Sequence, residues 1–78
     1  MGTDKIASLR GWIPVVEGAK AEVLVELHGA RLIFSSGAHV MRLAGITGTS
    51  TMSYDDARKS WLRAARRKIA QAEQEAAR

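Results

Sequence analysis

Apolar residues recur with helical spacing through the last third of the chain, from Ser53 to Arg78. At about 100° per residue, one arc of such a helix collects Tyr54, Ala57, Trp61, Ala65, Ile69, Ala72 and Ala76, with Leu62 and Ala64 at its edges. Ser53 suits the N-cap, and Asp55 and Asp56 follow where the positive end of the helix dipole favours carboxylates. The pattern predicts one long amphipathic helix, regular from Tyr54 to Ala72 and frayed beyond.

Upstream, apolar and polar residues alternate in Ala21–His28, where the valines and Leu27 share one face of an extended chain. Gly29 and the residue after it suit a type II′ turn, because glycine adopts a positive φ at the first central position. Pairing across this turn sets Leu27 opposite Leu32, apolar against apolar. We therefore predict an antiparallel hairpin over Glu22–Ser35.

The alternation continues past Ser36-Gly37, which suits a type I′ turn or a longer loop. A third strand over Ala38–Leu43 follows, and the register across the turn sets two pairs opposite each other: Leu32 with Met41, and Ile33 with Val40. The stretch Ala44–Met52 is rich in Gly and Thr and permits a fourth, edge-like strand that Gly48 would bend.

Near the N-terminus, three apolar residues recur at helical spacing after Thr3: Ile6, Leu9 and Ile13. Gly11 and Pro14 limit this helix, so we expect the chain to leave it by Gly11. The expected fold is α+β: an antiparallel β-meander of three to four strands, then one long C-terminal amphipathic helix, with room for a short N-terminal helix. At 78 residues the whole chain, 1–78, makes a single small domain.

Positive charge is concentrated on the C-terminal helix. The net charge is +4, and from Tyr54 onward seven Lys/Arg face four Asp/Glu, a balance of +3. No acid occurs between Arg58 and Lys68, and five cations form the candidate binding face: Lys59, Arg63, Arg66, Arg67 and Lys68. Arginine is suited to bidentate recognition of phosphate or carboxylate. The face is either a solvated surface or a site for nucleic acid or an acidic protein surface.

A second candidate surface is apolar. The predicted register aligns Leu24, Ile33 and Val40 on the sheet face opposite Leu32 and Met41, so both faces of the sheet carry apolar residues. Either the N-terminal helix or a second copy of the chain, as a homodimer, would cover this face. Trp12 is either an exposed contact residue or a lid over the sheet. These four residues form the candidate protein interface.

Candidate chemistry is sparse. His28 and His39 lack the spacing and acidic neighbours of a metal site, and the glycines of GITGTS, Gly45 and Gly48, lack the lysine and spacing of a phosphate loop. No nucleophile elbow is present. We therefore expect no enzyme, no metal, no cofactor and no small-molecule substrate.

Cysteine is absent, and no apolar run approaches the roughly 20 residues that span a bilayer. The N-terminus also lacks the layout of a signal peptide. We expect a cytoplasmic protein without a membrane partner.

The segment RLAGITGTSTMSYDDARKSWLRAARRKI, Arg42–Ile69, resembles small accessory proteins of Mu-like phages and prophages. In those proteins a G-I/V-x-x-T-S-T run precedes an acidic helix start and a W-x-x-A-A-R-R-K-I helix. The resemblance covers about a third of the chain and carries over no functional residue. It implies a phage-encoded protein that acts on nucleic acid or on a host factor, inhibitors of host defence included.

Two functions from different classes follow. The leading hypothesis is a small regulatory protein that engages an anionic surface, nucleic acid first, through the arginines of the C-terminal helix supported by Lys59 and Lys68. The alternative is a protein-interaction module, or an inhibitor of a host protein, that uses the apolar sheet face and Trp12. Salt separates them, because phosphate contacts weaken steeply with ionic strength and an apolar interface changes little.

Overall fold

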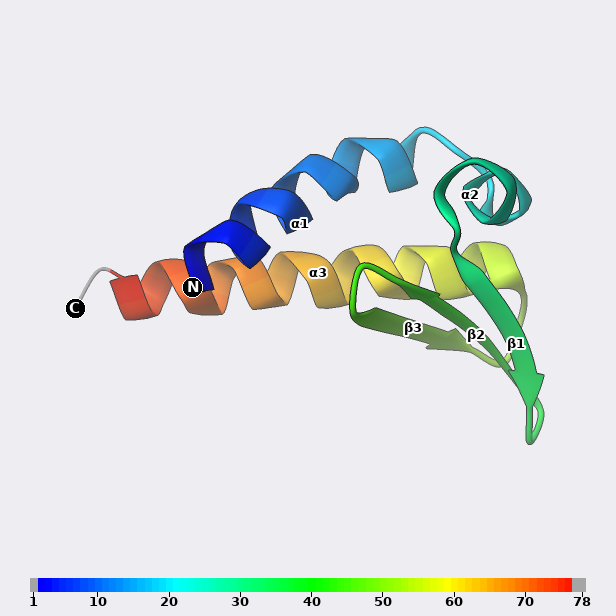
Figure 1. Ribbon diagram of the computed structural model, residues 1–78. Helices are drawn as coiled ribbons and strands as arrows, with labels where there is room; N and C mark the ends of the chain where they lie inside the picture. The colour runs from blue at the N-terminus through cyan, green and yellow to red at the C-terminus, as the bar shows by residue number, and fades with distance from the viewer. Residues whose placement is uncertain (1, 77–78) are drawn as a thin grey trace.

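The computed structural model describes residues 2–76, with side chains from Ile6 onward (Figure 1). This part of the chain forms six elements in the order α1 (Gly2–Glu17), α2 (Ala21–His28), β1 (Arg31–Ser35), β2 (Ala38–Leu43), β3 (Ile46–Ser50) and α3 (Tyr54–Ala76). The predicted α+β class is confirmed. In Figure 1, α1 runs along α3, while α2 lies over the start of β1 and the first turns of α3.

The strands form an antiparallel sheet in the order β1-β2-β3. The predicted pairs Leu32–Met41 and Ile33–Val40 are confirmed, and the edge-like strand expected after Ala44 is β3. Both connections are two-residue turns with positive φ at both central positions, as type I′ turns require: Ser36 and Gly37 (52° and 78°), and Ala44 and Gly45 (54° and 77°). Tight turns fix the register and therefore which side chains share a face.

The strand predicted at Ala21–His28 is wrong, because this segment is the helix α2. Leu24, expected on an exposed sheet face, is fully buried in the core, while Leu27 is 71% exposed. Gly29 takes a positive φ of 72° as the helix C-cap, and the Ala30 N–H donates to the Leu24 carbonyl at 3.1 Å. The hairpin over Glu22–Ser35 therefore does not form.

The segment is a helix and not the predicted strand because so short a run of apolar residues fits the spacing of either structure. Ala21 and Leu24 are three residues apart and share one helical face, on which both are buried. Glu22 and Glu26 then lie one turn apart in solvent. Burying two side chains of α2 against the sheet and α3 stabilises the helix over the strand.

The N-terminal helix is longer than predicted. α1 continues through Gly11 and Pro14 to Glu17, and Gly18 donates its N–H to the Pro14 carbonyl at 3.1 Å. Proline removes one intrahelical hydrogen bond, but Leu9 and Val16 on either side of it are buried in the core. Packing against α3 thus offsets the local cost and carries the helix past its predicted end.

α3 holds the core together. Trp61 is fully buried and its Nε1–H donates to the Leu43 carbonyl at 3.0 Å. Gly48 lets β3 approach the helix closely, because a Cβ there would collide with the Ala57 carbonyl and the Trp61 backbone. The predicted N-cap is confirmed, with the Asp56 N–H donating to Ser53 Oγ at 3.1 Å. The buried core comprises Leu9, Val16, Ala21, Leu24, Ala30, Met41, Leu43, Ile46, Ala57, Trp61, Leu62 and Ala65.

Candidate functional site

Three of the five predicted cations lie in line along the solvent side of α3. Arg63 and Arg67 are exposed, lie one helical turn apart and face away from buried Trp61 and Ala65. Neither forms an ion pair with any side chain from residue 6 to residue 76. Lys59 lies one turn before Arg63 and contacts the Asp55 carboxylate at 3.8 Å, and its side chain is more than half exposed.

Two of the five predicted cations lie elsewhere. Arg66 turns toward α1, where its Nη2 atom forms a 3.0 Å ion pair with Oε1 of Glu17. Both side chains are about half exposed, so the pair stabilises the fold by less than ~1 kcal/mol. Lys68 lies beside a groove between α1 and the β2–β3 turn, whose walls include Leu9, Trp12 and Gly45. The five cations therefore do not form the single band that was expected. Arg63 and Arg67 form a pair with Lys59 in line, and Arg66 and Lys68 lie at the sides.

Arg58 has a structural role, joining α1 to α3, that the sequence did not predict. Its Nη1 donates to the Val16 carbonyl at 2.8 Å, and Nε and Nη2 both donate to Oδ1 of Asp55, at 3.1 and 3.0 Å. The hydrogen bond and charge of Arg58, with a smaller contribution from Lys59, lower the pKa of Asp55 below 3.8. Arg58 thus caps the C-terminus of α1 and fastens it to the first turn of α3.

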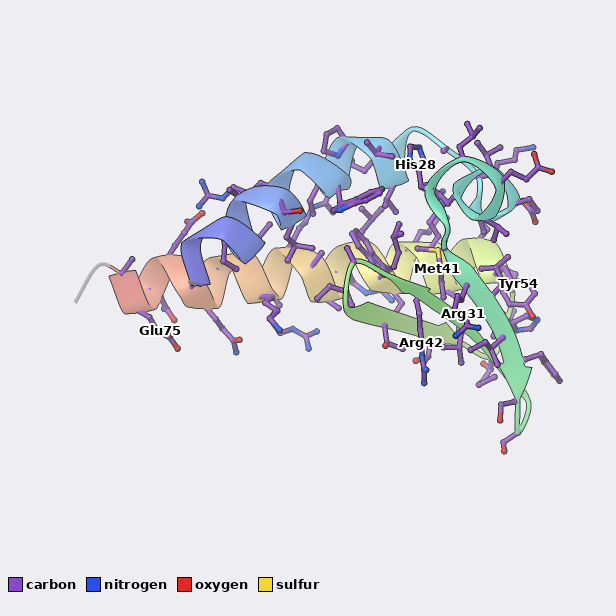
Figure 2. The ribbon with its side chains drawn as sticks, in the orientation of Figure 1. His28, Arg31, Met41, Arg42, Tyr54 and Glu75 are labelled. Atoms are coloured by element: carbon purple, nitrogen blue, oxygen red, sulfur yellow. The ribbon has the colours of Figure 1, made fainter. Side chains whose placement is uncertain are left out.

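The face of the sheet turned away from the helices, hereafter the outer sheet face, carries a second cationic group. Arg31 and Arg42 are direct cross-strand partners, and Thr47 continues the row on β3. Figure 2 shows both arginines on the side of the sheet away from α3, whereas Met41 points toward the helices. Both are exposed, and neither meets an acid among the described residues.

Next to this row lies an apolar one. Ile33 and Val40 are cross-strand partners on the outer sheet face, as the predicted alignment required, and both are partly buried. Leu24, predicted beside them, belongs to the core. Trp12 lies on α1, packs against the core and meets the His28 ring edge-on at 5.4 Å, so it does not extend the sheet surface. The interface of four residues predicted from sequence reduces to Ile33 and Val40.

The histidines take part in aromatic packing. His39 lies edge-on between Phe34 and Tyr54, with ring centroids 5.0 and 4.8 Å away, and its Nδ1 is 3.2 Å from the Ser50 carbonyl. Among the side chains of residues 6–76, no group of three or more His, Asp or Glu is arranged to hold a metal ion. None of the helices in that range combines the length and apolarity that crossing a bilayer requires.

Comparison with protein-family models, with curated proteins and with solved structures gave no match for this chain. Its function is therefore inferred from the geometry of its own surfaces.

Proposed function

We propose that this chain is a small non-catalytic binding protein that engages a polyanion, nucleic acid first, through Arg63 and Arg67 on the solvent side of α3. One observation carries the proposal: the two arginines lie one turn apart, exposed and without a described ion-pair partner. Arg58, Lys59 and Arg66 on the same helix each have an acidic neighbour. Arg63 and Arg67 are therefore the arginines of α3 that lack such a neighbour among the described side chains, and they are available for a partner.

The chemistry of these side chains fits phosphate. A guanidinium group offers planar, bidentate donors, and two of them about 6 Å apart along a helix can contact neighbouring phosphates of one strand. β3 lies alongside, since the Thr49 N–H donates to Ser60 Oγ at 3.4 Å, but its Thr47 and Thr49 side chains belong to the outer sheet face and are not part of this surface. Contacts with phosphates position a backbone without reading base sequence. The resemblance to phage accessory proteins accords with a phage-encoded cytoplasmic regulator of this type.

Fluorescence anisotropy with labelled single- and double-stranded oligonucleotides of unrelated sequence tests the proposal. We expect dissociation constants in the micromolar range at moderate salt, similar for all sequences. Arg63→Ala with Arg67→Ala should flatten the slope of log K against log salt by about 1.8, since each phosphate contact contributes about 0.9. Neither side chain lies on the packed side of α3, so the double variant should keep the fold.

The matched control is Arg31→Ala with Arg42→Ala, which also removes two exposed arginines without an ion-pair partner among the described side chains, here on the outer sheet face. This variant should keep the wild-type slope to within about half a unit, because its cations do not lie on the proposed contact surface. Absence of binding at micromolar protein, or equal losses in both variants, would contradict the proposal.

The second candidate is a protein-interaction module or an inhibitor of a host protein. The observation that favours it is the partly exposed pair of Ile33 and Val40 on the outer sheet face, on the side of the sheet away from α3. A homodimer through this face would be one form of it, and sedimentation at high protein concentration distinguishes a dimer from a monomer.

A further inference from the structure

The outer sheet face carries charged and apolar side chains in separate rows. Side chains of alternate residues on the three strands form rows across the sheet. One row is Arg31, Arg42 and Thr47, and the next is Ile33, Val40 and Thr49. A cationic row and an apolar row therefore lie side by side, separated by two residues along each strand, or about 6.8 Å.

The two arginines repel each other in the free protein. Directly opposite residues of an antiparallel pair have Cβ atoms about 5 Å apart, and like charges in that position are destabilising. Elsewhere in the described chain, Arg10, Arg58, Lys59 and Arg66 each contact a carboxylate. No described acid does so for Arg31 and Arg42, so a carboxylate supplied by another molecule would relieve the repulsion and gain two charge-assisted hydrogen bonds.

The dimensions of the face fit one helix. Its three strands are spaced about 4.8 Å apart, so the outer two are separated by about 10 Å, the diameter of a helix with side chains. The opposite face is already covered in this way by α3, through Gly48 and Trp61. One turn of a helix rises about 5.4 Å, close to the spacing between the rows. A helix lying along the strands can therefore place an aliphatic side chain on Ile33 and Val40 and an acid on the arginines.

Nucleic acid fits this face less well than α3. Ile33 and Val40 would be buried against phosphates or sugars without gain, and none of the side chains in the two rows is aromatic to offset this by stacking on a base. We propose that the outer sheet face docks an amphipathic helix of a partner protein, in which Asp or Glu side chains border the apolar stripe. This interaction does not depend on nucleic-acid binding by Arg63 and Arg67.

The test is a selection with the full chain as bait. A displayed library of helical peptides with randomised surface positions is enriched on the wild type and counter-selected on Arg31→Ser with Arg42→Ser. We expect enriched peptides to carry an acid one turn from an aliphatic pair. Their affinity should fall about tenfold or more on the double variant, because two charge-assisted hydrogen bonds are lost. Amide shift changes on binding should centre on β1 and β2.

The matched control, Arg63→Ser with Arg67→Ser, changes the net charge equally and should leave peptide affinity within about twofold. Thermal denaturation of Arg31→Ser with Arg42→Ser should show an unchanged or raised midpoint, which separates loss of binding from loss of fold. The proposal is overturned by failure to enrich any peptide, by peptides without acids, or by equal binding to the variant. A wild-type dimer that buries the outer sheet face would also overturn it, in favour of a second copy.

Discussion

Gly48 provides a sharp test of the packing between β3 and α3. A methyl group there would meet the Ala57 carbonyl and the Trp61 backbone, which cannot move aside as a flexible side chain could. Its φ lies outside the positive region, so the requirement for glycine is one of space. Overpacking costs about 1–3 kcal/mol, and a collision with backbone atoms lies at the upper end of this range. Alanine also stiffens the unfolded chain, which stabilises by ~0.5 kcal/mol. We therefore expect Gly48→Ala to lower the free energy of unfolding by about 2–3 kcal/mol.

For a domain of this size, ~1 kcal/mol shifts the thermal midpoint by about 4–8 °C, so Gly48→Ala should lower it by roughly 10 °C or more. The measurement is thermal denaturation followed by circular dichroism. Gly11→Ala is the matched control: Gly11 is inside α1 with open space around it, so the same substitution should stabilise by ~0.5–1 kcal/mol. An unchanged midpoint for Gly48→Ala would refute the close contact, and a lowered one for Gly11→Ala would refute the continuous α1.

Three further predictions follow from the packing and the electrostatics. Leu24→Ala should cost about 2–4 kcal/mol of unfolding free energy in urea titrations, whereas Leu27→Ala should cost under ~0.5 kcal/mol; equal effects would contradict the helix α2. Asp55→Asn should lower stability at neutral pH and converge with the wild type as pH falls below 3.8, because the contact with Arg58 lowers the pKa of this carboxyl in the folded state; a pH-independent difference would contradict this linkage. Trp61→Phe should cost about 1–3 kcal/mol, since the indole fills the core and satisfies a carbonyl of β2, and a neutral result would contradict that role.

The elements that sequence predicted well are those whose pattern admits a single geometry. α3 has more than five turns of one apolar stripe and a Ser53 cap, and the β1–β2 register follows from a two-residue turn between apolar pairs. α2 was assigned to the wrong class because eight residues with alternating valines satisfy both periods. Tertiary burial of Leu24 decides between them, and the sequence of that segment does not contain this information.

Parts of the candidate site were likewise accessible from sequence. Exposure of Arg63 and Arg67 follows from their position opposite Trp61, but the ion pair of Arg66 with Glu17 depends on where α1 packs and how far it continues. Arg31 and Arg42 were overlooked although the predicted register already placed them opposite each other. Attention to polar as well as apolar cross-strand pairs would have found this group.

The most direct test of the central proposal is an NMR titration of the wild type with a short DNA duplex, following backbone amides and the Nε–Hε groups of arginine. We expect the largest changes at Arg63 and Arg67, with Lys59 next, and a return to the free spectrum as salt is raised. Changes centred on Arg31 and Arg42, or a spectrum that does not respond at low salt, would contradict the assignment of nucleic-acid binding to α3.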